Sequence, residues 1–246
     1  MTTPVLETRG VTRVLPGVIP VTLVRDVNLA IGQGEFVSIV GPSGSGKSSL
    51  LYLLGLLDVP SEGELYLQGR DTSTLDEHEL AHLRLEKLGF VFQFHFLLPE
   101  FDALTNIMVP MRRLGKMNHR AMRERARGLL ADFGLEDAAD KRPGQLSGGM
   151  RQRVAVARAL ANDPLVILAD EPTGNLDQKS GRNVFDIFEG LVDTMGTTVI
   201  AVTHDEHLSA LTQRRITIVD GVIDADHKVN SGPARPGEPP RPELEI

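Results

Sequence analysis

The 246-residue chain contains no cysteine and no tryptophan. The absence of cysteine excludes disulfide bonds, cysteine-liganded zinc, an iron–sulfur cluster and a cysteine nucleophile. Long apolar runs are also missing. The longest, Leu50–Leu57, is interrupted by Gly55, and a membrane-spanning helix needs roughly 20 residues. The N-terminal residues lack the basic flank and apolar core of a signal peptide. We therefore expect a soluble chain without a signal peptide.

Basic residues are outnumbered, with 26 Lys and Arg against 33 Asp and Glu, which gives a formal net charge of −7. Binding to nucleic acid depends on clustered Lys and Arg that contact phosphates. The charge balance therefore argues against a nucleic-acid partner. Hydrophobic residues make up 41% of the chain and charged residues 24%, as in ordinary globular proteins.

Apolar strand-like runs alternate with helix-like stretches, which predicts an α/β fold with a parallel sheet. The predicted strands are 5–9, 22–31, 35–40, 64–68, 88–93, 165–169, 197–202 and 214–219. The predicted helices are 47–57, 76–86, 103–113, 119–133, 148–161 and 178–195. Segments 36–40, 166–169 and 199–202 are almost entirely apolar, as expected of strands that are buried on both faces.

The order of these elements divides residues 1–228 into two strand-rich parts around a mainly helical stretch at about 94–162. We interpret the helical stretch as an inserted subdomain, because strand–helix–strand alternation resumes after it. Residues 229–246 are rich in proline and hold almost no large apolar residue. Such a segment buries too little apolar surface to offset the entropy of ordering, so we predict a disordered tail.

A glycine-rich motif follows the apolar strand 36–40. Gly41, Gly46, Lys47 and Ser48 match G-x-x-x-x-G-K-[ST], a phosphate-binding loop between a strand and a helix. Glycines let backbone N–H groups curl around phosphate oxygens, and the helix start adds a positive field. Lys47 would contact the β- and γ-phosphates, and Ser48 would ligate Mg²⁺. The predicted nucleotide-binding residues of this loop are Gly41, Pro42, Ser43, Gly44, Ser45, Gly46, Lys47, Ser48 and Ser49.

Two acidic residues, Asp170 and Glu171, end the apolar strand 165–169. In an open α/β sheet the carboxyl ends of the strands face the ligand site, so Asp170 is suited to hold Mg²⁺ directly or through water. Because successive strand residues point to opposite sides, we expect Glu171 to point elsewhere and to polarise an attacking water. The alternative is a solvated acidic turn, which the phosphate loop makes the weaker interpretation.

Polar residues also follow two other predicted strands. His204 comes after strand 197–202 and could contact a γ-phosphate, although a capping or packing role also fits a lone histidine. Gln93 ends the predicted strand 88–93, and its neutral side chain could hold water or Mg²⁺. Both residues would lie at the sheet edge that carries the phosphate loop.

A second glycine motif, Leu146–Met150, opens the predicted helix 148–161. Ser147 is a favoured N-cap residue, and Gly148 and Gly149 permit close backbone approach. A helix start of this kind can bind an anion. The alternative interpretation is an ordinary capped helix.

In this order, the motifs resemble those of the nucleotide-binding subunits of ABC transporters. The resemblance rests on Gly41–Ser48, Gln93, Leu146–Gly149, Asp170–Glu171, Asn175–Asp177 and His204, and it covers about residues 5–225. It implies an α/β fold: a P-loop NTPase (RecA-like) core with an N-terminal antiparallel β subdomain and an inserted α-helical subdomain. It also implies ATP hydrolysis with Mg²⁺ as cofactor.

The resemblance assigns roles to the motif residues. The implied catalytic residues are Glu171 as the general base, His204, Gln93 and Lys47. The implied Mg²⁺ ligands are Ser48, Gln93 and Asp170. The implied ATP-binding residues outside the phosphate loop are the signature residues Ser147, Gly148 and Gly149 and the D-loop residue Asp177.

The resemblance further implies a head-to-tail homodimer, with each ATP between the phosphate loop of one subunit and the signature of the other. Movement of the two subunits would drive separate transmembrane permease subunits. Contact with the membrane would run only through these partners, at the cytoplasmic face of the inner membrane. The segment Phe94–Phe101 would form part of the groove for the permease coupling helix, with plain subdomain core as the alternative.

Shorter matches favour one branch of this family. Gln93–Asn106 and Glu171–Asp177 are similar to the lipoprotein-release and macrolide-export branch. The predicted function is lipoprotein release from the inner membrane, with macrolide or peptide export and the cell-division permease ATPase as alternatives. A soluble ABC-type ATPase of repair or translation is the alternative from another class. The chain lacks the coiled-coil insertion of the repair type and the second nucleotide domain of the translation type.

Two positions depart from the family pattern. Met150 ends the signature where the family commonly has glutamine. Ser147 and the backbone of Gly149 would still bind phosphate, so we expect reduced contact rather than its loss. No aromatic residue precedes the phosphate loop where the family stacks one on adenine. Leu15 or Val14 would pack on the base instead.

Overall fold

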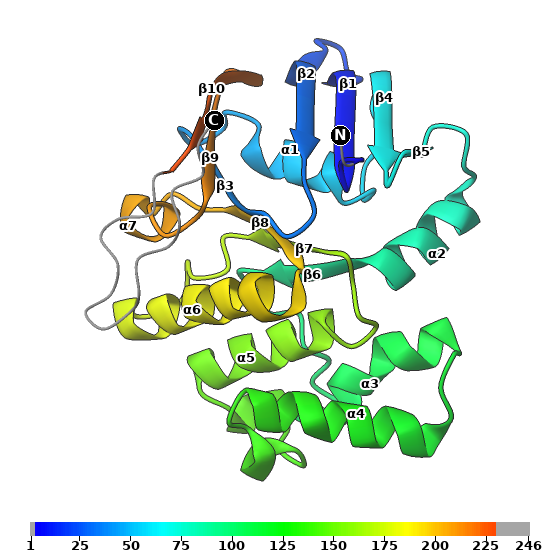
Figure 1. Ribbon diagram of the computed structural model, residues 1–246, viewed down its shortest axis with the longest axis vertical. Coiled ribbons are helices and arrows are strands. Elements are labelled where there is room, and N and C mark those ends of the chain that lie inside the picture. The colour runs from blue at the N-terminus through cyan, green and yellow to red at the C-terminus, as the bar shows by residue number, and fades with distance from the viewer. Residues whose placement is uncertain (1–2, 230–246) are drawn as a thin grey trace.

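The computed structural model describes residues 3–229, and these residues form two sheets with helices packed between and beside them (Figure 1). The first is an antiparallel sheet in the order β2-β1-β4-β5. Its strands are β1 (Leu6–Leu15), β2 (Val21–Ile31), β4 (Glu62–Leu67) and β5 (Arg70–Asp71). One face of this sheet is apolar and lies on the protein core, as is usual for an antiparallel sheet.

The second sheet has the order β10-β9-β3-β8-β7-β6. Its strands are β3 (Phe36–Val40), β6 (Leu88–Phe92), β7 (Val166–Asp170), β8 (Thr198–Val202), β9 (Arg214–Val219) and β10 (Val222–Lys228). All of these strands run parallel to their neighbours except β10, which is antiparallel to β9. Every residue of β3 and β8 is buried, because helices or the first sheet cover both faces.

Alternating residues of the parallel strands contribute to two different cores. Val37 and Ile39 point toward α1 (Lys47–Leu54) and the antiparallel sheet. Phe36 points the other way and packs on α6 (Gln178–Met195). There its ring centroid lies 5.7 Å from that of Phe185 and 6.3 Å from that of Phe188.

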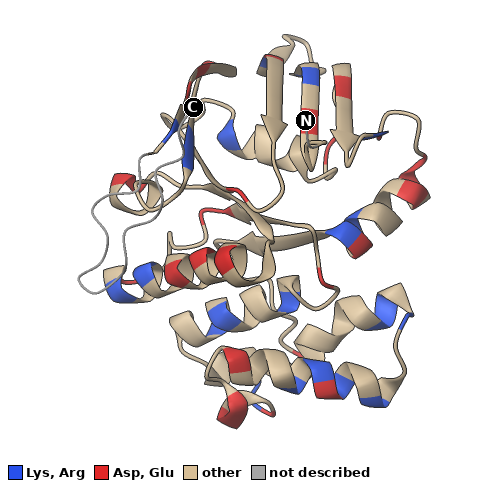
Figure 2. Ribbon diagram, viewed as in Figure 1, with Lys and Arg blue, Asp and Glu red and all other residues tan. Residues whose placement is uncertain are grey.

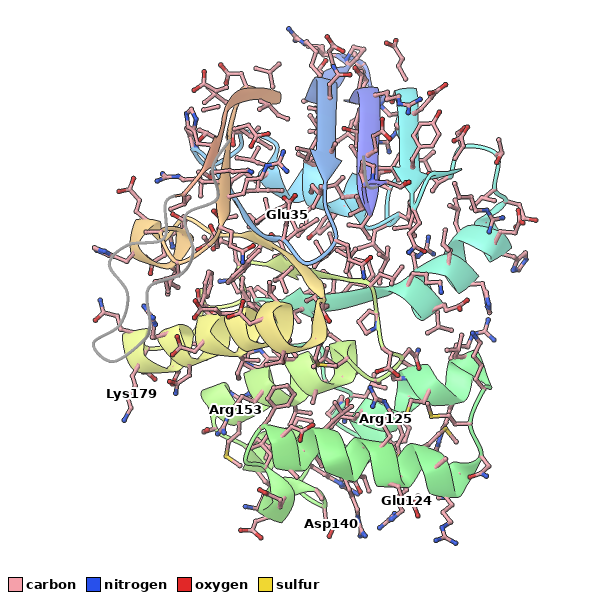
Figure 3. The ribbon with its side chains drawn as sticks, viewed as in Figure 1. Glu35, Glu124, Arg125, Asp140, Arg153 and Lys179 are labelled. Carbon is pink, nitrogen blue, oxygen red and sulfur yellow. The ribbon has the colours of Figure 1, made fainter. Side chains whose placement is uncertain are left out.

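The helical insertion lies between β6 and β7 in the chain and below the parallel sheet in Figure 1. It contains α3 (Ala103–Leu114), α4 (His119–Asp132), η1 (Glu136–Ala138), η2 (Pro143–Gln145) and α5 (Gly148–Ala159), and α2 (Glu77–Lys87) precedes β6. Arg125 on α4 and Arg153 on α5 are labelled in Figure 3. Arg125 donates to the carbonyls of Leu160 and Ala161, and Arg153 donates to that of Phe133. These bonds satisfy backbone carbonyls that helix ends leave free.

The α/β fold class predicted from the sequence is confirmed, with an antiparallel β subdomain and an inserted helical subdomain around a P-loop core. The sequence pattern missed β5, β10 and α7 (Glu206–Ser209). All three are short or polar: β10 has no buried residue, so no apolar pattern marks it. Val229 donates its N–H to the carbonyl of Gln213. The rest of the tail predicted to be disordered, 230–246, lies outside the described residues.

Within residues 3–229, no helix combines the length and the apolar character needed to cross a lipid bilayer.

The Phe36–Phe185–Phe188 cluster makes a stability prediction. Phe188 is fully buried, so Phe188→Ala should lower the free energy of unfolding by about 3–5 kcal/mol, measured by urea denaturation. Met195→Ala, at a position that is 55% exposed on the same helix, should change it by less than about 0.5 kcal/mol. Equal losses in the two variants would contradict the assignment of this cluster as core.

Candidate functional site

The phosphate loop connects the end of β3 to the start of α1 at the carboxyl edge of the parallel sheet. Gly41 and Gly46 have φ angles of +148° and +99°, which residues other than glycine rarely adopt. A Cβ atom at Gly41 would lie 2.0 Å from the carbonyl oxygen of Ile218, and one at Gly46 would lie 2.2 Å from that of Leu23. The backbone can therefore close into this loop only with glycine at both positions.

The loop presents donors that suit a polyphosphate. The first N–H groups of α1 have no acceptor within the helix, and no acidic residue stands in its first turn. The ammonium group of Lys47 donates to the carbonyl of Pro42 at 2.8 Å, so its charge is held over the loop by a neutral acceptor. The buried hydroxyl oxygen of Ser45 has no hydrogen-bond partner among the described residues. These groups fit a phosphate chain, which would supply the anionic acceptors.

Asp170, the last residue of β7, is held by two hydroxyl groups from α1. Ser48 donates to its Oδ1 at 2.9 Å, and Tyr52 donates to its Oδ2 at 2.8 Å. Burial and the hydrogen bond to Asp170 raise the pKa of Tyr52 to about 12, so the phenol keeps its proton at neutral pH. A serine hydroxyl next to a carboxylate is a donor set that suits Mg²⁺.

Glu171 follows Asp170 in a left-handed conformation with φ of +47°. From the sequence we expected strand alternation to turn Glu171 away from Asp170, but β7 ends at Asp170. The left-handed backbone sets the direction of Glu171 instead. Its N–H donates to the carbonyl of Val202, and its carboxylate lies 2.8 Å from Nδ1 of His204. A strained non-glycine residue of this kind is typical of functional sites.

Gln93 lies directly after β6 and contacts the segment between β7 and α6. Its side-chain amide donates to Oδ1 of Asn175 at 3.4 Å, and the Asn175 amide donates to the Gln93 carbonyl at 3.2 Å. A Cβ atom at Gly174 would lie 2.7 Å from Nε2 of Gln93, so the two segments are in close contact.

The second glycine motif caps α5, as the sequence predicts. Ser147 is the N-cap, and its side chain accepts from the N–H of Met150. A Cβ atom at Gly148 would lie 3.7 Å from the side chain of Leu176, and one at Gly149 would lie 3.3 Å from the hydroxyl of Ser180. Asp177 is the N-cap of α6, and its two carboxylate oxygens accept from the N–H and hydroxyl of Ser180. These bonds lower the pKa of Asp177.

Two side chains fasten the segment after Gln93 to α5. Nε2 of His95 lies 3.1 Å from the carbonyl oxygen of Gly148, and its Nδ1 lies 3.2 Å from that of Gln93. Arg158, in the last turn of α5, donates to the carbonyls of His95 and Phe96 at 2.7 Å each. Burial lowers the pKa of Arg158. Tyr52 belongs to no motif, and His95 was predicted only as one residue of the Phe94–Phe101 segment, so the sequence predicted neither of these contacts.

Apart from Gln93, which contacts Asn175, and Asp177, which caps α6, the predicted site residues fall into two groups. The phosphate loop and the carboxyl ends of β7 and β8, with Asp170, Glu171 and His204, form one continuous edge of the parallel sheet. The signature residues Ser147, Gly148 and Gly149 begin α5, and their contacts run to His95, Leu176 and Ser180 rather than to the loop. One chain thus carries two separate helix starts suited to anions.

The strand–loop–helix unit and the acidic end of the neighbouring strand define a P-loop nucleotide-binding protein. A model of the family described as "ABC transporter" matches residues 24–174. The chain therefore belongs to the ABC transporter family, as one of its ATPases.

Two relatives show which members of the ABC transporter family the chain resembles. It is 47% identical over 219 residues to the lipoprotein-releasing system ATP-binding protein LolD of Aquifex aeolicus, a match that covers 89% of this chain and 96% of that protein. It is 53% identical over 228 residues to the macrolide export ATP-binding/permease protein MacB of Burkholderia cenocepacia, covering 92% of this chain and 33% of MacB.

Among solved structures, a dimeric post-hydrolysis state of the ATP-binding cassette MJ0796, bound to ADP and Pi, has a TM-score of 0.85 and 42% identity. That match covers 92% of this chain and 99% of the MJ0796 chain.

The charge of Lys47 makes a binding prediction. Lys47→Ala removes the only full positive charge in the loop sequence 41–49. Affinity for a fluorescent ATP analogue should therefore fall roughly 10- to 100-fold, the range for losing a charged hydrogen bond. Lys228→Ala, an exposed lysine at the end of β10, should bind as the parent does. Unchanged binding by Lys47→Ala would contradict the phosphate-loop assignment.

Proposed function

We propose that this chain is the ATP-hydrolysing subunit of a transporter that releases lipoproteins from the inner membrane. The observation that carries the proposal is the likeness to LolD, which extends over 96% of that protein. The chain would act at the cytoplasmic face, attached to separate permease subunits, and would reach the membrane only through them.

Each polar residue of the sheet edge has a role in this proposal. Lys47 and the loop N–H groups hold the β- and γ-phosphates. Glu171 accepts the proton of the attacking water, and its contact with His204 fixes the direction of the carboxylate. Ser48, Gln93 and Asp170 would hold Mg²⁺, which when bound offsets negative charge on the phosphates.

The second helix start requires a second copy of the chain. Ser147, Gly148 and Gly149 contact segments other than the phosphate loop of their own chain, so they would bind the ATP held by a partner. The MJ0796 cassette with ADP and Pi is described as a dimer, which supports this arrangement. ATP would close the head-to-tail homodimer, and hydrolysis would open it. Asp177 would join this interface from the start of α6.

A groove of about 430 Å³ is suited to the permease. It lies between α2, β6, α3 and α5, with an apolar floor that includes Phe90, Phe92 and Val109. Three basic residues line it: Arg84, Arg113 and Arg158. Arg84 and Arg158 donate to neutral backbone carbonyls, and within residues 3–229 neither forms an ion pair with a carboxylate. Figure 2 shows basic residues on α3, α4 and α5, with acidic ones also on α4, while α6 carries both basic and acidic residues.

The expected occupant is an amphipathic permease helix with acidic side chains beside its apolar face. The segment Phe94–Phe101 adjoins the groove, because the rings of Phe92 and Phe96 lie 5.4 Å apart. Phe94 and Phe96 are 66% and 63% exposed. Such exposed aromatic side chains favour an interface.

Macrolide export is the second candidate function, favoured by the 53% identity to MacB. Because MacB is named as a combined ATP-binding and permease protein and this chain matches 33% of it, the likeness concerns the ATP-binding part. Peptide export, a cell-division permease or a soluble role in repair or translation would use the same ATP chemistry, but the likeness to LolD favours none of these three.

Replacing the proposed base should trap the dimer. Glu171→Gln keeps the size of the side chain but cannot accept a proton, so ATP should bind, dimerise the chain and turn over at least about 100-fold more slowly. Light scattering with ATP and phosphate release measure the two effects. Glu189→Gln on α6 serves as the control and should hydrolyse ATP at the parent rate. Near-normal turnover by Glu171→Gln would remove this residue as the base.

The identity of the permease tests the function itself. Tagged chain purified from membranes of its own host should carry a permease with four spans and a large extracytoplasmic domain. Arg113→Glu should reduce the recovered permease at least roughly tenfold, because it places a negative charge in the basic groove. Arg123→Glu, at an exposed site on α4 outside the groove, should recover it as the parent does. Recovery of a six-span permease would contradict lipoprotein release.

A further inference from the structure

Tyr52 reaches the metal side of the site although it lies outside every motif of the sequence. Ser48 and Tyr52 are four residues apart on α1, so their side chains lie on one face of the helix. Each donates a hydroxyl to a different oxygen of Asp170, at 2.9 Å and 2.8 Å. Two side chains of α1 thus form hydrogen bonds with both carboxylate oxygens of Asp170, which belongs to the neighbouring strand β7.

Two hydrogen bonds, one to each oxygen, fix the orientation of the Asp170 carboxylate, whereas a single bond does not. A carboxylate held at one oxygen still rotates about its last side-chain bond, whose energy well is broad. A second bond at the other oxygen fixes the plane of the group. Ser48 is itself assigned as a metal ligand, so its hydroxyl serves two partners. The hydroxyl of Tyr52 serves Asp170 alone in this scheme.

We propose that Tyr52 is a positioning residue that fixes the Asp170 carboxylate in the orientation required for binding Mg²⁺. This inference rests on the proposed metal role of Asp170. Tyr52 does not touch the nucleotide or take part in proton transfer. Its effect is on the affinity for the metal rather than on the affinity for metal-free ATP.

A structural role predicts a different result. If the Tyr52 hydroxyl only tied α1 to β7, removing it would lower stability and leave the metal affinity unchanged. The chain also supplies a matched control. Its one other tyrosine, Tyr66 on β4, donates to Glu64 at 2.7 Å on the exposed face of the antiparallel sheet. Tyr66→Phe removes a comparable hydroxyl–carboxylate bond that lies on the other sheet.

The test measures Mn²⁺ binding by electron paramagnetic resonance, with the full chain and a non-hydrolysable ATP analogue. In Tyr52→Phe the dissociation constant for Mn²⁺ should rise about three- to tenfold, the effect of losing one hydrogen bond. Binding of the analogue in the presence of EDTA should not change. Tyr66→Phe should leave both quantities at the parent values. An unchanged or lower Mn²⁺ constant in Tyr52→Phe would overturn the inference.

Asp170→Asn separates this inference from the function on which it rests. If Asp170→Asn weakens Mn²⁺ binding and Tyr52→Phe does not, only the role of Tyr52 fails. If Asp170→Asn binds Mn²⁺ as the parent does, the metal role of Asp170 fails, and the role of Tyr52 with it. The double variant should bind Mn²⁺ no more weakly than Asp170→Asn alone, because Tyr52 acts only through Asp170. An additive loss would contradict positioning.

Discussion

The parallel direction of the central strands is the constraint on which the rest of this structure depends. Because β3, β6, β7 and β8 run the same way, their carboxyl ends meet at one edge of the sheet. Residues far apart in the chain, from the phosphate loop to His204, become neighbours there. Because these strands are buried on both faces, their residues are almost all apolar. The polar residues of the site therefore lie at the ends of the strands.

The same motifs show how far a sequence predicts a site. The β3–loop–α1 unit and the end of β7 could be predicted because their residue types have few structural alternatives. Glu171 was predicted as a site residue, but the direction of its side chain was not. Its left-handed φ occurs together with a bond from its N–H to the carbonyl of Val202 on the next strand, a contact that the sequence does not show. The contacts of Tyr52 with Asp170 and of His95 with Gly148 were not predicted, because a hydroxyl or an imidazole acquires such a role only from the partner that the fold places beside it.

Exposed polar strands and helices were harder to predict from the sequence for a related reason. An exposed strand such as β10 buries no side chain, so its formation is driven by backbone pairing with β9 and by contacts that no local pattern records. Arg214 of β9 gives one such contact, with bonds to Asp226 on β10 and to Glu35. Asp226 is 12 residues from Arg214 in the sequence and Glu35 is 179 residues away, so neither contact follows from a local pattern.

Hydrogen bonds at the two ends of α5 connect the proposed permease groove with the proposed dimer interface. Arg158 lines the groove and holds the carbonyls of His95 and Phe96, while His95 reaches Gly148 at the other end of the same helix. A rigid helix fastened at both ends to the segment after Gln93 cannot shift without moving that segment. A displacement in the proposed groove would therefore reach the proposed signature residues and Gln93 together, which would couple the permease partner to the start of α5.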